Sequence, residues 1–276
     1  MKRIAIFAAL AAAAAAQAPD VETIMDHVGR NQAQAVALRQ EFSFNQKQLL
    51  RLNRGNGKIA REEHREYYVV PNGNGVRKEL LRLEGKYEHK GKYVTYDQPG
   101  YKRKGLDADG DLIRDLSEDT TNDSKSRDGI GADLFPLTTE EQRKYDFKLL
   151  GAEQYRGREV YRIGFEPKPD QGDADWKGEA LIDAAEFQPV WVHTELASRI
   201  PRAVKILLGT DIKGLGFSVS YQKFEDGVWF PVSYGGEFEL RAVFFYKRTI
   251  SVNLTNTEFH RTNVSSSVTY HLANEQ

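Results

Sequence analysis

The sequence contains no cysteine, which excludes disulfide bonds, thiol nucleophiles and the acylated cysteine of an anchored lipoprotein. Long apolar runs are also missing: the N-terminal run from Ile4 to Ala16 is shorter than the roughly 18 residues that a membrane-spanning helix needs. The formal net charge is only -1, with Lys and Arg interspersed among Asp and Glu. Nothing electrostatic therefore favours nucleic acid or an anionic membrane surface as a partner.

Motifs of the common catalytic sites are absent as well. The sequence has no G-x-S-x-G, H-E-x-x-H, P-loop or G-x-G-x-x-G pattern. The histidines are dispersed, without a close pair at metal-ligand spacing, and they are His27, His64, His89, His193, His260 and His271. We therefore expect no metal, no cofactor and no enzyme activity.

One acidic stretch, Asp107 to Glu118 (DADGDLIRDLSE), carries carboxylates at the first, third, fifth, ninth and twelfth places, as a calcium-binding loop does. Such a loop needs glycine at the sixth place for its sharp turn, and Leu112 stands there. Moving the frame to bring Gly110 to the sixth place removes the first and last carboxylates. The flanking residues are basic or polar, so we interpret the stretch as an acidic surface loop.

The N-terminus has the pattern of a secretory signal peptide. Lys2 and Arg3 precede the apolar run, and small residues allow cleavage between Ala16 and Ala18. An uncleaved membrane anchor is the alternative. The expected organisation is a signal peptide at 1–18 and a single domain at 19–276, which would lie in the periplasm or outside the cell.

The next segment predicts an amphipathic helix, with Asp20 as its N-cap. An apolar stripe at helical spacing follows, made of Val21, Ile24, Met25 and Val28. Gly29 is a point at which the helix can be interrupted before the pattern resumes.

From Glu41 onward the apolar period changes to two, as half-buried strands require. The 14 Phe and 13 Tyr supply a large core. Turns rich in Gly and Asn separate the candidate strands, which include 41–52, 145–150, 159–165, 176–182, 189–196, 216–224, 228–234, 238–246 and 248–254. The fold class expected is therefore mainly β, with a mostly antiparallel sheet and a few helices.

Residues 97–133 are polar, with one apolar group at 112–116. We interpret them as a long solvent-exposed loop that could include one short helical turn. Loops of this length often form lids or binding loops. After it, Thr138 and Glu141 have the spacing of a capping box, which predicts a short helix.

A second group of carboxylates precedes one candidate strand, and it consists of Asp170, Asp173, Asp175 and Glu179. Two carboxyls about 5–10 Å apart would suit a glycosidase-type hydrolase. The same composition is typical of any solvated turn. The tryptophans at 176, 191 and 229 could stack on a sugar, although tryptophan on a half-buried strand more often belongs to the core.

A curved antiparallel sheet with large apolar side chains on its inner face offers a concave apolar surface. If the covering helix and lid leave part of it open, an acyl chain can occupy the space, because each methylene removed from water contributes about 0.8 kcal/mol. The alternative is that these side chains fill a dry core. The candidate lining residues alternate along three strands and are Phe42, Phe44, Phe217, Val219, Tyr221, Ile250, Val252 and Leu254.

Four short segments follow the predicted N-terminal helix, in this order: FSFNQK from Phe42, FPL from Phe135, YDFK from Tyr145 and FEPK from Phe165. Their order resembles the outer-membrane lipoprotein-sorting, LolA/LolB-like family over most of residues 19–262. The resemblance implies a half-open antiparallel β-barrel covered by an N-terminal helix and a lid segment, with an apolar cavity for lipoprotein acyl chains. For the family's gating arginine, the equal candidates are Arg61, Arg65 and Arg77.

These observations predict an exported, non-catalytic carrier of lipid or lipoprotein acyl chains in the periplasm. The expected partners are those acyl chains and, as a further candidate, a membrane protein; nucleic acid is not expected. One alternative is a periplasmic lipid-sensing regulator of a membrane partner. The other is a secreted hydrolase that uses a carboxylate pair.

Overall fold

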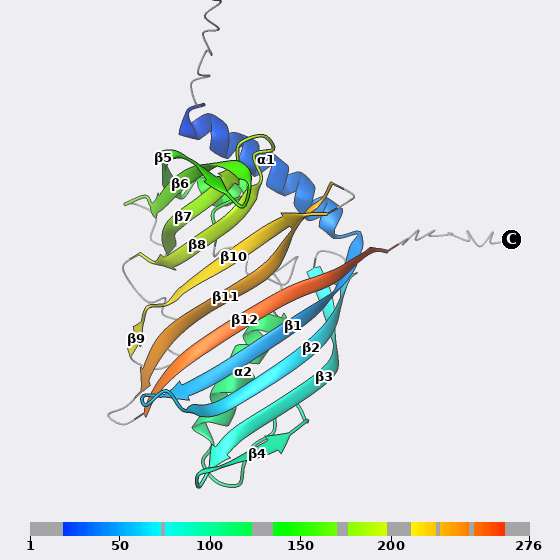
Figure 1. Cartoon of the computed structure of the whole chain (residues 1–276), viewed down its shortest axis with the longest axis vertical. Helices are drawn as coiled ribbons and strands as arrows, with labels where there is room; N and C mark the ends of the chain where they lie inside the picture. The colour runs from blue at the N-terminus through cyan, green and yellow to red at the C-terminus, as the bar shows by residue number, and fades with distance from the viewer. Residues whose placement is uncertain are drawn as a thin grey trace, which may run out of the picture.

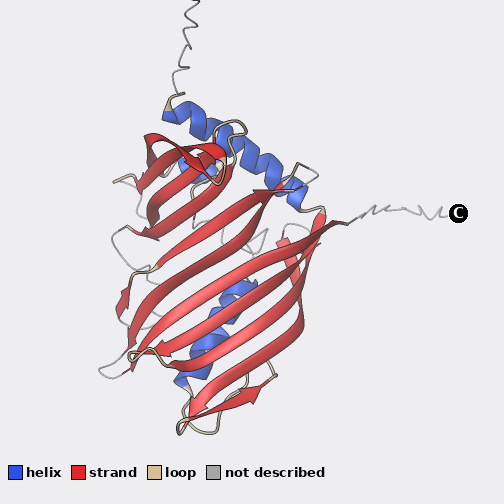
Figure 2. Ribbon diagram, viewed as in Figure 1, coloured by secondary structure: helices blue, strands red, loops and turns tan. Residues whose placement is uncertain are grey.

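The computed structural model describes residues 19–72, 75–122, 135–169, 176–197, 211–224, 227–242 and 246–262. Within them, twelve strands form one antiparallel sheet in the order β4-β3-β2-β1-β12-β11-β10-β8-β7-β6-β5, and β9 pairs with β11 beside this path (Figures 1 and 2). The strands are β1 (Phe42–Arg54), β2 (Ile59–Asn72), β3 (Gly75–His89), β4 (Lys92–Tyr96), β5 (Tyr145–Tyr155), β6 (Arg158–Pro167), β7 (Trp176–Asp183), β8 (Pro189–Leu196), β9 (Asp211–Lys213), β10 (Gly216–Lys223), β11 (Trp229–Ala242) and β12 (Tyr246–Arg261). Because β4 and β5 end this path without pairing with each other, the sheet is open, as predicted.

Three helices accompany the sheet among these residues, namely α1 (Val21–Arg39), α2 (Ala108–Asn122) and α3 (Thr139–Gln142). The N-terminal helix α1 packs against α3, β5 and β11, near the β5 end of the sheet. The second helix, α2, packs against β1 and β2 near the other end (Figure 1). The predicted arrangement of a mainly β fold covered by an N-terminal helix and a further segment is confirmed.

The first helix begins where its cap predicts. The Asp20 carboxylate accepts a hydrogen bond from the Thr23 backbone N–H at 2.7 Å. The helix then continues through Gly29 to Arg39, so the expected interruption at Gly29 is wrong. Gly29 instead permits close packing, because a Cβ there would lie 2.6 Å from the hydroxyl of Thr139 on α3.

The capping box also forms as predicted: the Thr138 hydroxyl accepts from the Glu141 N–H at the start of α3. The strand predictions hold for most elements. The separate strand expected at 238–246 does not exist as such, because β11 is continuous from Trp229 to Ala242. Residues 229–235 pair with β10 and residues 233–242 pair with β12, so one long strand joins the two neighbours.

The prediction of a solvated loop over 97–133 is wrong for residues 108–122, which form α2; residues 123–133 lie outside the described part. Asp107 begins this helix by accepting a hydrogen bond from the Gly110 N–H at 3.1 Å. The apolar group of the segment is buried against the sheet, and it consists of Leu112, Ile113 and Leu116. The stretch that resembles a calcium loop is therefore largely the first turns of a helix.

Two main apolar cores result. The first lies under α1 and includes Ile24, Val28, Ile163, Val192 and Val219. The second lies under α2 and includes Leu50, Leu52, Ile113, Ile250 and Leu254. Their separation leaves a middle region of the sheet that neither helix covers with its own core.

Candidate functional site

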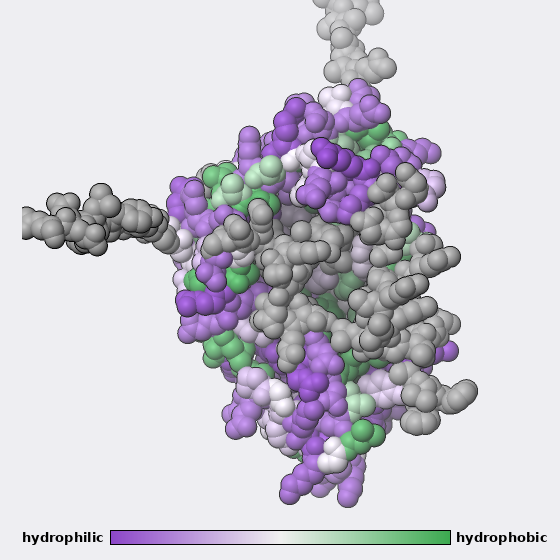
Figure 3. Space-filling view, turned by 180° about the vertical axis from the view of Figure 1, so that it is seen from behind, coloured by the Kyte–Doolittle hydropathy of each residue, from purple (hydrophilic) through white to green (hydrophobic). Residues whose placement is uncertain are grey.

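The strand register places both helices on the same face of the sheet. Val219, in the core under α1, lies opposite Tyr234 of β11, and Tyr234 lies opposite Leu254, in the core under α2. Directly opposed residues project to the same face. The middle of this face, which we call the inner face, therefore lies between the two helices. Figure 3, which views the molecule from behind the sheet, shows apolar surface near its middle.

Half-buried apolar residues occupy this middle region. We call them the central apolar strip, and they are Trp176, Leu196, Phe217 and Tyr234. Phe217 and Tyr234 pack against both cores, and all four members pack against the core under α2. The strip is thus continuous with the interior yet keeps part of its surface exposed.

Ring packing fixes the geometry of the strip. Phe217 stacks on Tyr234 with ring centroids 5.3 Å apart and planes 14° apart, and Trp176 meets Phe217 edge-on at 5.9 Å. Gly236 makes room for this arrangement, because a Cβ there would lie 2.6 Å from the Phe217 ring. The glycine and the three rings therefore form one preorganised aromatic surface.

The hydroxyl of Tyr234 is the polar feature of the strip. Burial among apolar atoms raises the pKa of Tyr234 and keeps it protonated. No residue of the described ranges forms a hydrogen bond with this hydroxyl. Tyr234 is only half-buried, so its protonated hydroxyl can donate to a polar group of a ligand.

The eight residues predicted to line a cavity all lie on β1, β10 and β12. Of the eight, only Phe217 is half-exposed. The other seven are buried at 7% exposure or less, and they are Phe42, Phe44, Val219, Tyr221, Ile250, Val252 and Leu254. The structure thus brings one predicted residue to an open surface and packs the rest into its own cores.

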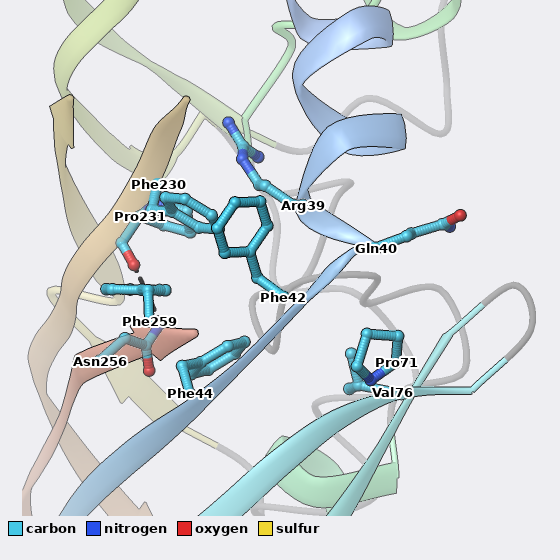
Figure 4. Close-up of a pocket in the computed structure, with 10 residues that line it drawn as sticks. All are labelled: Arg39, Gln40, Phe42, Phe44, Pro71, Val76, Phe230, Pro231, Asn256 and Phe259. Atoms are coloured by element: carbon cyan, nitrogen blue, oxygen red, sulfur yellow. Dashed lines mark hydrogen bonds between the residues drawn. The ribbon is translucent and has the colours of Figure 1, made fainter. Parts of the chain in front are cut away.

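Phe42 and Phe44 lie at the start of β1 in two small clusters that share Phe259 (Figure 4). Phe42 meets Phe230 edge-on at 5.0 Å, and Phe259 lies 4.3 Å from Phe230. The space between these rings is only about 10 Å³, which is about enough for one water molecule. This cluster cannot hold an acyl chain.

Sequence reasoning missed Tyr234 and Leu196 as site residues and left Trp176 between core and sugar stacking. The turn residues Glu225–Gly227 could have led to Tyr234, because they predict a hairpin between the strands on either side. A short loop there places β10 opposite β11, and the alternation then puts Tyr234 on the face of Val219.

A buried ionic network fastens α2 beside the strip. Arg61 is 1% exposed and donates to Asp107 at 2.9 Å and to the Tyr96 hydroxyl at 2.7 Å. Burial opposes its charge, but Tyr96 and Asp107 outweigh this and raise the pKa of Arg61. Arg65 pairs with Glu63 in the same network, with 2.5 Å between Nη2 and the carboxylate.

The three candidate gating arginines differ in their burial and their contacts. Arg61 and Arg65 are buried between β2 and α2, where they hold the helix in place. Arg77, on β3, is exposed. Any effect of Arg61 or Arg65 on ligand access would therefore act through the position of α2.

The hydrolase alternative gains no support from the described residues. Asp170, Asp173 and Asp175 lie outside them, and Glu179 forms an ion pair with Arg162 at 2.7 Å. A Ser218–His193 hydrogen bond of 2.9 Å lies one residue along β10 from Phe217, and so on the opposite face from the strip. No group of three or more His, Asp or Glu in the described ranges is placed to hold a metal ion.

That opposite face carries a groove of about 550 Å³ beside β4. Most of its lining residues are charged or polar, among them Glu62, His64, Glu84, Lys86 and Asp97. Such a lining does not suit an acyl chain, so the central apolar strip remains the candidate site.

No family model and no curated protein matches this chain. Similar solved structures include a proposed outer membrane lipoprotein-sorting protein domain from Vibrio parahaemolyticus, with 12% identity over 89% of this chain and 95% of that one and a TM-score of 0.40. A DUF1329 family protein from Desulfovibrio piger has 11% identity over 90% and 95%, with a TM-score of 0.38. A LolA superfamily protein from Nitrosomonas europaea has 13% identity over 90% and 96%, with a TM-score of 0.37.

Two of these three descriptions name the family that the sequence resembles. At such TM-scores the likeness concerns only the general arrangement of the elements. In the described part of the chain, no helix is long and apolar enough to cross a membrane.

Proposed function

We propose that this chain binds the acyl chain of a lipid or lipoprotein on its central apolar strip, between α1 and α2, and carries it without catalysis. The observation that carries the proposal is the stacked pair Phe217–Tyr234, which packs against both cores and is still half-exposed. A preorganised aromatic surface in the middle of a sheet favours an apolar ligand, because little ordering cost remains for the protein side.

The magnitude is sufficient for binding. Ten methylenes taken from water onto the strip would contribute about 8 kcal/mol. The loss of translational and rotational freedom on association costs at least about 4 kcal/mol. The difference of at most about 4 kcal/mol corresponds to an affinity of about 1 mM, a weak binding that suits a carrier that must also release its ligand.

The Tyr234 hydroxyl narrows the ligand class. A pure hydrocarbon would leave this group without a hydrogen bond in apolar surroundings. An ester or amide carbonyl near the head of an acyl chain can accept from it. We therefore infer an acyl ester or amide, as found in lipids and acylated proteins, rather than an alkane.

The proposed place of action is the periplasm. Its support is the signal-peptide pattern of residues 1–18, which lie outside the described residues. A carrier in that compartment would take acyl cargo from one membrane and pass it to another site, which is also the role that the sequence resemblance implies.

The first test is native mass spectrometry of the full chain after expression through the secretory route. Co-purified acyl lipid is the expected result. A second test titrates a fluorescent fatty-acid ester into the lipid-free protein. Phe217→Ala should weaken probe binding about tenfold or more, and Tyr234→Phe should weaken binding of the ester but not of a hydrocarbon probe.

The matched control is Phe224→Ala, because Phe224 is another half-buried aromatic residue but belongs to the separate cluster with Phe230. This variant should bind the probe like the wild type. If the folded wild-type protein neither retains lipid nor binds the probe, the proposal is wrong.

A further inference from the structure

One end of the molecule is strongly basic although the whole chain has a net charge of -1. This end, which we call the basic end, comprises residues 54–58, 88–92 and 97–107, in the lower part of Figure 1. These residues include seven Lys and Arg but only three carboxylates, Glu88, Asp97 and Asp107. The net charge of the whole chain does not reveal this local excess of positive charge, because the carboxylates that balance it lie elsewhere in the chain.

Contacts show that the turns of the basic end lie side by side. Arg54, at the end of β1, forms an ion pair with Glu88 of β3. The Tyr93 hydroxyl of β4 donates to the Ile59 carbonyl at the start of β2 at 3.4 Å. The β1–β2 turn, with Lys58, and the β3–β4 turn, with Lys90, therefore lie next to each other.

Four of the basic side chains are available for a partner. Arg54, Lys102 and Arg103 are already paired, with Glu88, Asp111 and Asp107 respectively. The remaining four are exposed and form no ion pair with any described residue, and they are Lys58, Lys90, Lys92 and Lys104. Exposed lysines without an ion-pair partner in the protein can attract an anionic partner. They contribute little to the stability of the fold.

Two large apolar side chains project from the same end. Leu106 is 85% exposed and Tyr93 is 53% exposed. The backbone beside Leu106 is held by its own loop, since the Arg103 guanidinium donates to the Leu106 carbonyl at 2.6 Å and 3.1 Å. An aliphatic residue fixed outward beside lysines costs solvation free energy in water unless something apolar receives it.

We propose that the basic end docks on a bilayer surface rich in anionic phospholipids, with the lysines at the phosphates and Leu106 in the headgroup layer. Phosphate-rich surfaces attract each nearby lysine, and the apolar boundary below them accepts leucine and tyrosine. An acidic protein surface would satisfy the lysines but leaves no reason for an 85% exposed leucine. Where the proposed function holds, docking brings the acyl carrier to the membrane at which cargo is loaded or released.

The test is co-sedimentation of the full mature chain with vesicles of equal parts phosphatidylglycerol and phosphatidylcholine, against vesicles of phosphatidylcholine alone. Binding to the anionic vesicles that weakens with added salt is expected. Replacing each of the four free lysines by glutamine should weaken binding about fivefold, and all four together by more than about a hundredfold. Leu106→Ser should weaken it further, by about tenfold.

Two controls match these changes elsewhere. Lys148→Gln alters an exposed lysine of β5, and Leu150→Ser alters a leucine of β5 that is 46% exposed. Both should leave vesicle binding unchanged. Equal binding to the two vesicle types, no binding to either, or wild-type binding by the four-lysine variant would overturn the inference.

The two proposals fail separately. The four-lysine variant should still bind the fatty-acid ester probe in solution, because the strip is untouched. Probe binding without vesicle binding removes the docking surface only. Vesicle binding without probe binding supports the docking surface and removes the carrier function.

Discussion

Arg248 of β12 and Asp109 of α2 form a two-point ion pair, with 2.7 Å between Nε and Oδ1 and 3.0 Å between Nη2 and Oδ2. Tyr246 donates to the same carboxylate at 2.8 Å. Two residues earlier, Asp107 is held by Arg61 of β2. The N-terminus of α2 is thus bound by ion pairs to two strands, β2 and β12, that are separated by β1.

Replacing Arg248 by Met should loosen the start of α2 and lower the free energy of unfolding by about 1–3 kcal/mol, because two charge-assisted hydrogen bonds to a part-buried carboxylate are lost. Urea unfolding measures the change. The double variant Arg248→Met, Asp109→Leu should recover part of the loss, since no carboxylate then remains unpaired. Equal losses that simply add would contradict a direct interaction.

Arg61→Met should be more damaging, by about 3–5 kcal/mol, because it leaves the 5% exposed Asp107 carboxylate without its main partner. Arg61→Lys should recover only part, because an ammonium cannot reach Tyr96, Tyr101 and Asp107 at once. The control is Arg82→Met, whose side chain is 60% exposed and pairs only at the surface. A small, equal effect of both methionine variants would show that the network does not fasten α2.

Acid should destabilise the protein through Glu62. Burial opposes ionisation of this carboxyl, but hydrogen bonds from Lys86, Arg51 and His64 outweigh it and lower its pKa from 4.5 to about 2. A pKa that is lower in the folded state gives stability that is complete above about pH 4.5 and is lost as the pH falls toward 2. The contribution is up to about 3 kcal/mol.

The measurement is the free energy of unfolding in urea between pH 7 and pH 2. Glu62→Gln should lower it at pH 7 and should flatten its decline below pH 4.5. Glu84→Gln, which changes an exposed carboxylate of the neighbouring strand, should keep the wild-type profile. An unaltered decline in Glu62→Gln would mean that other carboxyls cause the acid sensitivity.

Gly85→Ala should cost about 1–3 kcal/mol, because the new methyl would lie 2.2 Å from the Tyr96 ring and push it away from Arg61 and Glu63. Thermal or urea unfolding checks this. The matched substitution is Gly75→Ala, where no atom lies within 4 Å of the added carbon. It should change stability by less than about 0.5 kcal/mol; a comparable loss there would point to a backbone effect instead.

Features that depend on neighbours in the sequence were predictable. The cap at Asp20, the capping box at Thr138 and the antiparallel pairing of β10 with β11 all appear where the sequence indicates. Each rests on a hydrogen bond or turn within a few residues. The alternation of apolar residues likewise assigned most strands.

The helix α2 could not be predicted in this way. Its partners come from far along the chain: Arg61 is 46 residues from Asp107, and Arg248 is 139 residues from Asp109. Without them the segment is acidic and has only three apolar side chains to bury. Ion pairs with these distant arginines, together with burial of its apolar side chains against the sheet, stabilise the segment as a helix.

The exposed residues of the central apolar strip could not be predicted from the sequence either. Val219 and Phe217 lie two residues apart on β10 and share a face, yet Val219 is fully buried and Phe217 is not. An arginine at Val219 would therefore test folding rather than ligand binding. Only packing distinguishes the two positions.

The sequence by itself determined the period of each element, the caps and turns, and which apolar side chains share a face, because these follow from local backbone geometry. The tertiary structure decided which of those side chains α1 and α2 cover and which remain half-exposed between them. It also gathered four unpaired lysines at one end of a nearly neutral chain. The physical reason is that burial and local charge depend on segments that meet only after folding.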